Sequence, residues 1–161
     1  MGTLTDSVAQ YFAGEGWDVS RSSSEPALRM GVSTKNARWQ CVVNVDEDEE
    51  IVFLHSVCPL KAPAESRSRV AEFLMRLNRT VYMGHFVMDF DSGEIRFETY
   101  VHGENGSISA GAMDSFLNRN IATMDKHVCD IARVISTEIP PAEAMTQVLT
   151  GMPANRGYQY N

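Results

Sequence analysis

Cysteine is scarce in this sequence, and its few copies lie far apart. Cys41, Cys58 and Cys129 are the three cysteines in 161 residues, and they form no Cys-x-x-Cys pair. An odd number of widely separated cysteines is typical of reduced thiols and not of a disulfide framework. The sequence therefore predicts a cytoplasmic protein whose fold needs no covalent cross-link.

A basic leader and long apolar runs are absent as well. Residues 1–6 read MGTLTD, which is not the basic start of a signal peptide. Because position 6 is Asp, the segment also fails as a myristoylation signal. No apolar stretch approaches the roughly 20 residues that cross a bilayer. We expect no membrane contact.

The sequence has no excess of positive charge. Its 14 basic and 21 acidic residues give a net charge of −7, whereas a general nucleic-acid binder needs a positive field to attract phosphates. Residues 46–50 are five consecutive acids, DEDEE. This run lacks the alternating spacing and the glycine of a calcium loop. We interpret it as a solvated hairpin turn that discourages pairing at a sheet edge.

Motifs for nucleophilic catalysis and phosphate binding are missing. Residues 106–110, GSISA, lack the last glycine of a nucleophile elbow. Residues 14–16 and 103–106, GEG and GENG, carry acids where a phosphate loop needs bare amides. His85 and His102 are candidate neighbours across a hairpin, but two histidines do not make a nucleophile with its base. We expect no catalytic residues and no enzyme.

The candidate metal ligands are two His and Cys pairs. His55 and Cys58 are three apart at the end of a predicted strand, and His127 and Cys129 are two apart on a predicted helix. Both spacings turn the paired side chains away from each other, whereas zinc needs four convergent ligands. We therefore expect neither a metal nor a cofactor.

The pattern that is present changes its period along the chain. An apolar stripe at helical spacing predicts a helix over 64–81, with Val70, Phe73, Leu74, Leu77 and Val81 on one face. Alternation then predicts a hairpin over 84–102 that turns at residues 91–93. One face of its strands carries Phe86, Met88 and Phe90, then Ile95, Phe97, Thr99 and Val101.

The remaining elements complete a single domain. We predict helices over 3–13, capped by Thr3 with Asp6, and over 110–136, capped by Ser109. The other predicted elements are strands over 27–32, 37–45 and 51–57, and a short helix over 142–149. The order α-β-β-β-α-β-β-α predicts an α+β domain over 1–138, with an antiparallel sheet of about five strands packed against helices. Residues 139–161 are predicted to form the short C-terminal helix and a flexible tail.

This order of elements resembles that of the YbjN-like family, bacterial proteins described as sensory transduction regulators. The resemblance covers roughly residues 4–138 and is carried by Trp39, Arg69-Val70, residues 73–78 (FLMRLN), 84–86 (GHF) and 89–96 (DFDSGEIR), and Met124-Asp125. It implies a fold like that of type III secretion chaperones, which are small α+β protomers that commonly dimerise and bind partner segments. It implies no catalytic residues.

Methionine and arginine mark a candidate surface. Nine methionines are a high count for this length, and flexible thioethers suit surfaces that accept varied partners. Core filling is the alternative for most of them, and we expect Met88, Met113 and Met124 in the core. Lys61 and Arg67 add to the positive charge near the second helix. The predicted partner or dimer surface comprises Met75, Met83, Arg69, Arg76 and Arg79.

The resulting hypothesis is a non-enzymatic binding module that acts as a homodimer, chaperone-like or adaptor-like, and recognises a segment of another protein. Two alternatives remain open. In the first, the domain is a small-molecule-responsive regulator. In the second, the basic second helix binds an anionic or nucleic-acid partner, and salt bridges or a dimer contact are the competing explanation of its charges.

Overall fold

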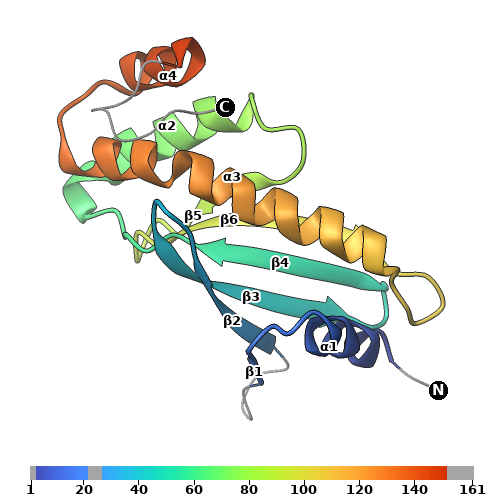
Figure 1. Ribbon diagram of the computed structural model, residues 1–161. Helices are drawn as coiled ribbons and strands as arrows, with labels where there is room; N and C mark the ends of the chain where they lie inside the picture. The colour runs from blue at the N-terminus through green and yellow to red at the C-terminus, as the bar shows by residue number, and fades with distance from the viewer. Residues whose placement is uncertain (1–2, 22–26, 152–161) are drawn as a thin grey trace.

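The computed structural model describes residues 3–21 and 27–151. These residues form one six-stranded sheet, and α3 lies over one face of it against β4 and β6, with α2 and α4 beyond it (Figure 1). The elements are α1 (Leu4–Gly14), β1 (Val19–Arg21), β2 (Ala27–Ser33), β3 (Arg38–Asp46), β4 (Ile51–Val57), a 3-10 turn η1 (Ala64–Ser66), α2 (Arg67–Asn78), β5 (His85–Met88), β6 (Ile95–His102), α3 (Ala110–Ser136) and α4 (Pro141–Thr150).

The sheet is antiparallel throughout, in the order β1-β2-β3-β4-β6-β5. Alternate residues of each strand join one continuous core with the apolar faces of the helices, whereas the other face of the sheet stays outside that core. The α+β prediction is confirmed, with six strands where about five were expected. No helix in the described part of the chain is both long enough and apolar enough to cross a bilayer.

The first helix is held at its start by two devices. Thr3 and Asp6 form the predicted capping box. The carboxylate of Glu47 adds a long-range cap, since it accepts hydrogen bonds from the backbone N–H groups of Leu4 (3.0 Å) and Thr5 (2.8 Å). A hydrogen bond from the Thr5 hydroxyl, followed by these backbone bonds, holds the pKa of Glu47 below its usual range. The acidic turn is therefore a docking point for α1.

The edge-protecting role expected of the acidic turn is wrong. The turn joins β3 and β4, which lie inside the sheet and are each paired on both sides. Glu50 instead accepts a hydrogen bond from the backbone N–H of Gly106, which ties the turn to the loop after β6.

The second helix is shorter than predicted. It begins after the 3-10 turn η1 and ends at Asn78, so Val81 lies outside it. The side-chain amide of Asn78 turns to β5 instead, accepting from the N–H of Phe86 (2.7 Å) and donating to its carbonyl oxygen (3.0 Å). This contact fixes the end of the helix and the start of the hairpin together.

The hairpin also differs from its prediction in two details. β5 ends at Met88, so Phe90 lies in the turn, where it is 55% exposed. His85 pairs with Glu98 and His102 pairs with Ile51, so the expected contact of the two histidines across the hairpin is wrong. Backbone hydrogen bonds from Asp89 to Glu94 and from Gly93 to Asp89 close the turn, which places Phe90 inside it and sets the register that pairs His85 with Glu98.

The last two helices agree closely with their predictions. Helix α3 spans the expected residues, and the Ser109 hydroxyl caps it by accepting from the N–H of Ala112. Helix α4 packs against α2 and begins at Pro141, in the position of the predicted 142–149 helix. Met113 and Met124 are buried as expected, and Met88 is partly buried. The predicted flexible tail lies mostly outside the described residues.

Candidate partner-binding groove

The sheet has an open edge along the second half of β6. Strand β5 pairs with β6 only from Ile95 to Glu98. On the opposite side, the N–H of Cys58 donates to the Ile95 carbonyl and the N–H of Gly103 donates to Glu50. Peptide groups alternate in direction along an antiparallel strand. Those of Tyr100 and His102 therefore point away from β4, and no strand in the described part of the chain pairs with them.

The other half of this sheet edge is covered. In β5, the peptide groups of His85 and Val87 face β6, so those of Phe86 face outwards. The side-chain amide of Asn78 binds both of these outward groups. We call the uncovered peptide groups of Tyr100 and His102 the open edge.

Gly84 causes the opening. It precedes β5 and has a φ of +88°, a conformation that glycine adopts without strain. A Cβ atom here would lie 2.4 Å from the Glu98 carbonyl oxygen and 2.6 Å from a methyl carbon of Thr99. The chain therefore passes close to β6 at this point and then diverges, so that Tyr82 and Met83 do not pair with the strand.

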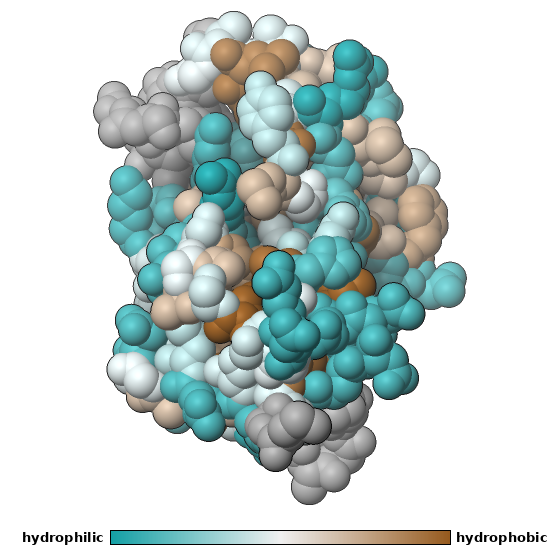
Figure 2. Space-filling model, turned by 90° about the vertical axis from the view of Figure 1, so that its right-hand side faces the viewer, coloured by the Kyte–Doolittle hydropathy of each residue, from teal (hydrophilic) through white to brown (hydrophobic). Residues whose placement is uncertain are grey.

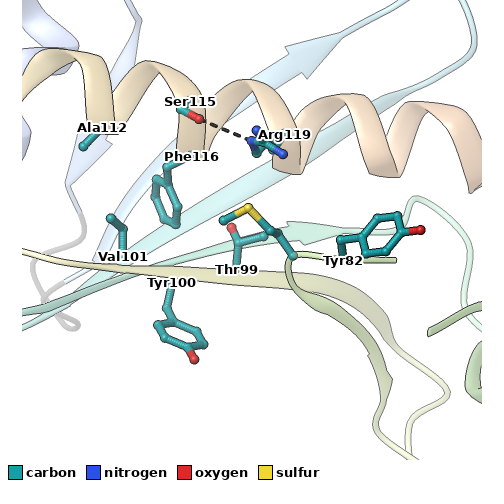
Figure 3. A pocket seen from close by; sticks show the side chains of 9 residues that line it. Tyr82, Thr99, Tyr100, Val101, Ala112, Ser115, Phe116 and Arg119 are labelled. Atoms are coloured by element: carbon teal, nitrogen blue, oxygen red, sulfur yellow. Dashed lines mark hydrogen bonds between the residues drawn. The ribbon is translucent and has the colours of Figure 1, made fainter. Parts of the chain in front are cut away.

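A groove lies between the open edge and the first half of α3. Its volume is about 430 Å³, and we call it the β6 groove. Figure 3 shows Phe116 pointing from α3 towards β6, with Thr99 and Val101 pointing back to the helix and Tyr100 pointing away. The lining residues are Tyr82, Met83, Thr99, Tyr100, Val101, Ala112, Ser115, Phe116 and Arg119.

The rim of the groove is apolar and exposed. Tyr82 is 100% exposed and Met83 is 53% exposed, at the point where the chain leaves the sheet. Figure 2 views the end of the molecule at which α3 begins and shows small apolar areas within a mainly hydrophilic surface. Large exposed apolar side chains beside a hollow are typical of binding surfaces.

The groove is positively charged within an acidic protein. A second hollow of about 280 Å³ shares Tyr82, Met83 and Arg119 with it and adds Lys126. Neither hollow is lined by a described Asp or Glu. The Arg119 Nε donates to the Ser115 hydroxyl (3.3 Å), and Arg119 has no ion pair among the described residues. The site can therefore pair with a negative charge.

A buried polar network fixes α3 against the strands beside the groove. The side-chain nitrogen of Asn120, which is 0% exposed, reaches the carbonyl oxygens of Leu54 (3.1 Å) and Phe97 (3.2 Å) and the Thr99 hydroxyl (2.9 Å). Its side-chain oxygen accepts from the Ser56 hydroxyl (2.6 Å). Buried polar groups that are fully bonded specify one arrangement of their elements.

The outer face of the sheet carries a second set of polar groups. The Glu98 carboxylate lies 3.1 Å from Nδ1 of His55 and 3.5 Å from Nε2 of His85. Burial lowers the pKa of His55, and the Glu98 charge partly opposes this effect. The Phe53 ring stacks on His55 and lies near Tyr100, which connects this face to the open edge.

The described residues contain no group of three or more His, Cys, Asp or Glu side chains that could hold a metal ion. Cys41 and Cys58 are buried. Burial raises the pKa of both thiols, that of Cys58 to about 11, so neither has the character of an activated nucleophile.

The predicted arginines bond mainly within the protein. The Nε of Arg69 donates to the Val134 carbonyl (3.2 Å), and its guanidinium lies 3.5 Å from the Glu138 carboxylate. Arg76 pairs with Glu72 one turn earlier on α2 (2.8 Å). These contacts agree with the alternative that salt bridges within the protein explain the positive charges of the second helix.

The other predicted surface residues lie in different places. Met83 lines the β6 groove, whereas Met75 lies on α2 and is 69% exposed. Arg79 borders a separate hollow with Met145 and Leu149 of α4. Among the predicted site residues, Met83 therefore lines the groove and the other four do not.

The sequence interpretation missed the open edge, Tyr82, Arg119 and Asn120. Asn120 had a visible signal, since it falls on the apolar stripe of α3 between Leu117 and Met124. The open edge had no such signal in the sequence, because it depends on which residues of β6 have no paired residue on β5.

Residues 5–131 match the family model of YbjN, described as "Putative bacterial sensory transduction regulator". No curated protein matches the sequence significantly. The structure is similar to that of YbjN from E. coli, described as "a putative transcription regulator", with a TM-score of 0.63 and 8% identity over 82% of this chain and 94% of that chain.

A second similar structure is a chain of the ExsC–ExsE complex. Its TM-score is 0.52 at 10% identity, over 78% of this chain and 91% of that chain. At these identities the likeness concerns the fold, and it confirms the predicted chaperone-like arrangement.

Proposed function

Because the chain belongs to the YbjN family, we propose that it is a non-enzymatic regulator that works by binding another protein. In this proposal it is a bacterial, cytoplasmic protein that acts as a homodimer, in the manner of a chaperone or an adaptor. The family description and the similarity to a chain of the ExsC–ExsE complex support a role in protein binding.

The observation that carries the proposal is the open edge beside the β6 groove. Backbone hydrogen-bonding groups, apolar side chains and an arginine without an ion pair among the described residues occur together there. Such a combination suits a polypeptide, which offers peptide groups and side chains at regular spacing.

A small-molecule ligand is a second candidate. The β6 groove, at about 430 Å³, is within the roughly 300–1,000 Å³ range of ligand pockets. A thermal-shift screen with metabolite pools tests this candidate, because a ligand that binds the native state raises Tm. The nucleic-acid alternative has less support, since Arg69 and Arg76 bond within the protein.

The proposal is tested by capture of partners with the tagged protein and by light scattering of what elutes. We expect a near-stoichiometric protein partner and a bait with twice the 17.9 kDa protomer mass. Met83→Asp should abolish capture without unfolding, because it places a charge in the apolar rim of the groove. Met75→Asp, on α2, tests the predicted dimer surface in the same way.

Leu60→Asp is the matched control, since Leu60 is exposed but does not line the groove. Retained capture by Met83→Asp would exclude the groove as the partner site. A monomeric wild-type protein would exclude the homodimer and leave the binding role to be judged by capture alone.

A further inference from the structure

We propose that the β6 groove binds an extended segment of a partner protein as an added strand, hydrogen-bonded to Tyr100 and His102, with one acidic side chain at Arg119. This inference rests on the proposed function and specifies how the partner is recognised. The recognition is by backbone pairing, and side chains supply the selectivity.

The backbone geometry carries the first step. Tyr100 and His102 each present one N–H and one carbonyl group outwards, at the two-residue spacing of a strand. The line of β5 stops at His85, and Gly84 turns the chain away from β6. A guest strand can therefore occupy the position that β5 leaves empty.

The side chains of the guest follow from the alternation of the sheet. Thr99 and Val101 point to α3, so a guest residue beside them points into the β6 groove, towards Phe116 (Figure 3). This position is lined by apolar groups and favours an apolar side chain. The neighbouring guest residues point to the outer face, beside Tyr100 and His102.

Charge selects the guest further. Arg119 lines both hollows and Lys126 lines the second, and no described carboxylate lines either of them. A guest acid near Arg119 would give the arginine the ion pair that it lacks among the described residues. A second copy of this chain fits less well, because two facing grooves would bring their arginines towards each other.

The test begins with a phage-displayed library of random eight-residue segments, selected on the full-length protein. We expect enrichment of segments that combine apolar residues at alternate positions with an acid. The best segment is then synthesised, and amide hydrogen exchange is measured with and without it. In the protein alone, the amides of Tyr100 and His102 should exchange fast and those of Val101 and Gly103 slowly.

Strand addition predicts that the peptide slows exchange at Tyr100 and His102. N-methylation of the peptide amides that face β6 should weaken binding by about tenfold or more, since each removes a hydrogen bond. Methylation of the alternate amides is the matched control and should have little effect. Arg119→Glu should weaken binding about tenfold, and Lys35→Glu, an exposed cation outside the groove, should not.

Peptide binding without protection of Tyr100 and His102 would overturn strand addition and leave the proposed function intact. Failure to enrich any segment would overturn the inference, and capture of a folded partner would then show that the function survives it. Loss of both capture and enrichment would reject the proposed function itself. Displacement of the peptide by residues 152–161 of this chain would identify an internal occupant and also overturn the inference.

Discussion

Replacing Asn120 tests whether the buried network fixes α3 to the sheet. Its side-chain nitrogen offers two protons to three acceptors, and its oxygen accepts from Ser56. The Asn120→Ala variant therefore loses about three hydrogen bonds, each with a net contribution of about 1 kcal/mol. Ala is the better helix former, which offsets a few tenths of a kcal/mol. We expect the free energy of unfolding to fall by about 2–4 kcal/mol.

The assay is urea unfolding followed by circular dichroism, with a thermal scan beside it. A loss of about 3 kcal/mol corresponds to a Tm lower by roughly 6–12 °C in a domain of this size. Asn118→Ala is the matched control, because Asn118 is exposed on the same helix. Its free energy of unfolding should change by no more than about 0.5 kcal/mol.

The Asn120→Asp variant separates hydrogen bonding from packing. Asp has the same shape, but its carboxylate cannot donate to the Leu54 and Phe97 carbonyl oxygens that Asn120 contacts. Burial against these oxygens should raise the pKa of the new carboxyl group. Its folded state then binds a proton more readily than its unfolded state, so stability should recover as the pH falls. Equal stabilities of Asn120→Ala and Asn118→Ala would refute the reasoning.

Three further predictions concern other parts of the molecule. Because burial lowers the pKa of His55 from 6.5, the contribution of His55 to the free energy of unfolding should be constant above pH 6.5 and be lost as the pH falls below it. The His55→Gln variant should therefore show a smaller change of unfolding free energy with pH in urea unfolding, and an unchanged pH dependence would contradict the assignment. Burial raises the pKa of the Cys41 and Cys58 thiols, so both should react with iodoacetamide at about pH 8 only after unfolding. Mass spectrometry that finds a label on either cysteine in the native protein would contradict this prediction. Gly84→Ala should lower the free energy of unfolding by about 1–3 kcal/mol, since the positive φ and the 2.4 Å approach to the Glu98 carbonyl both exclude a Cβ; Gly31→Ala, where a Cβ meets nothing within 4 Å, is the control and should be nearly neutral.

Local patterns predicted most of the fold. The bounds of α3 follow from an apolar stripe that continues over many turns and from a capping serine, both of which are properties of neighbouring residues. The predicted α2 was too long because Val81 continues the apolar stripe. The helix ends at Asn78, whose side chain bonds to Phe86 of β5, and periodicity carries no information about this long-range contact.

The candidate site was harder to predict because it depends on the unequal lengths of two neighbouring strands. Met83 was identified from composition, but the groove around it exists because β5 is shorter than β6. The hydrogen-bonding side of Tyr100 and His102 depends on the register with β4. That register becomes visible only when the strands are placed beside each other.

The shortness of the open edge has a consequence for aggregation. Sheets with long, flat, uncovered edges can recruit further copies and grow into fibrils, and the segments responsible are about six or seven residues long. At one end of this sheet β1 has three residues, and at the other the Asn78 amide covers Phe86 of β5. Two outward-facing residues, Tyr100 and His102, are enough to hold a short guest but too few to template a growing fibril. The protein can thus keep a strand-accepting surface without the hazard that a longer one would bring at high concentration.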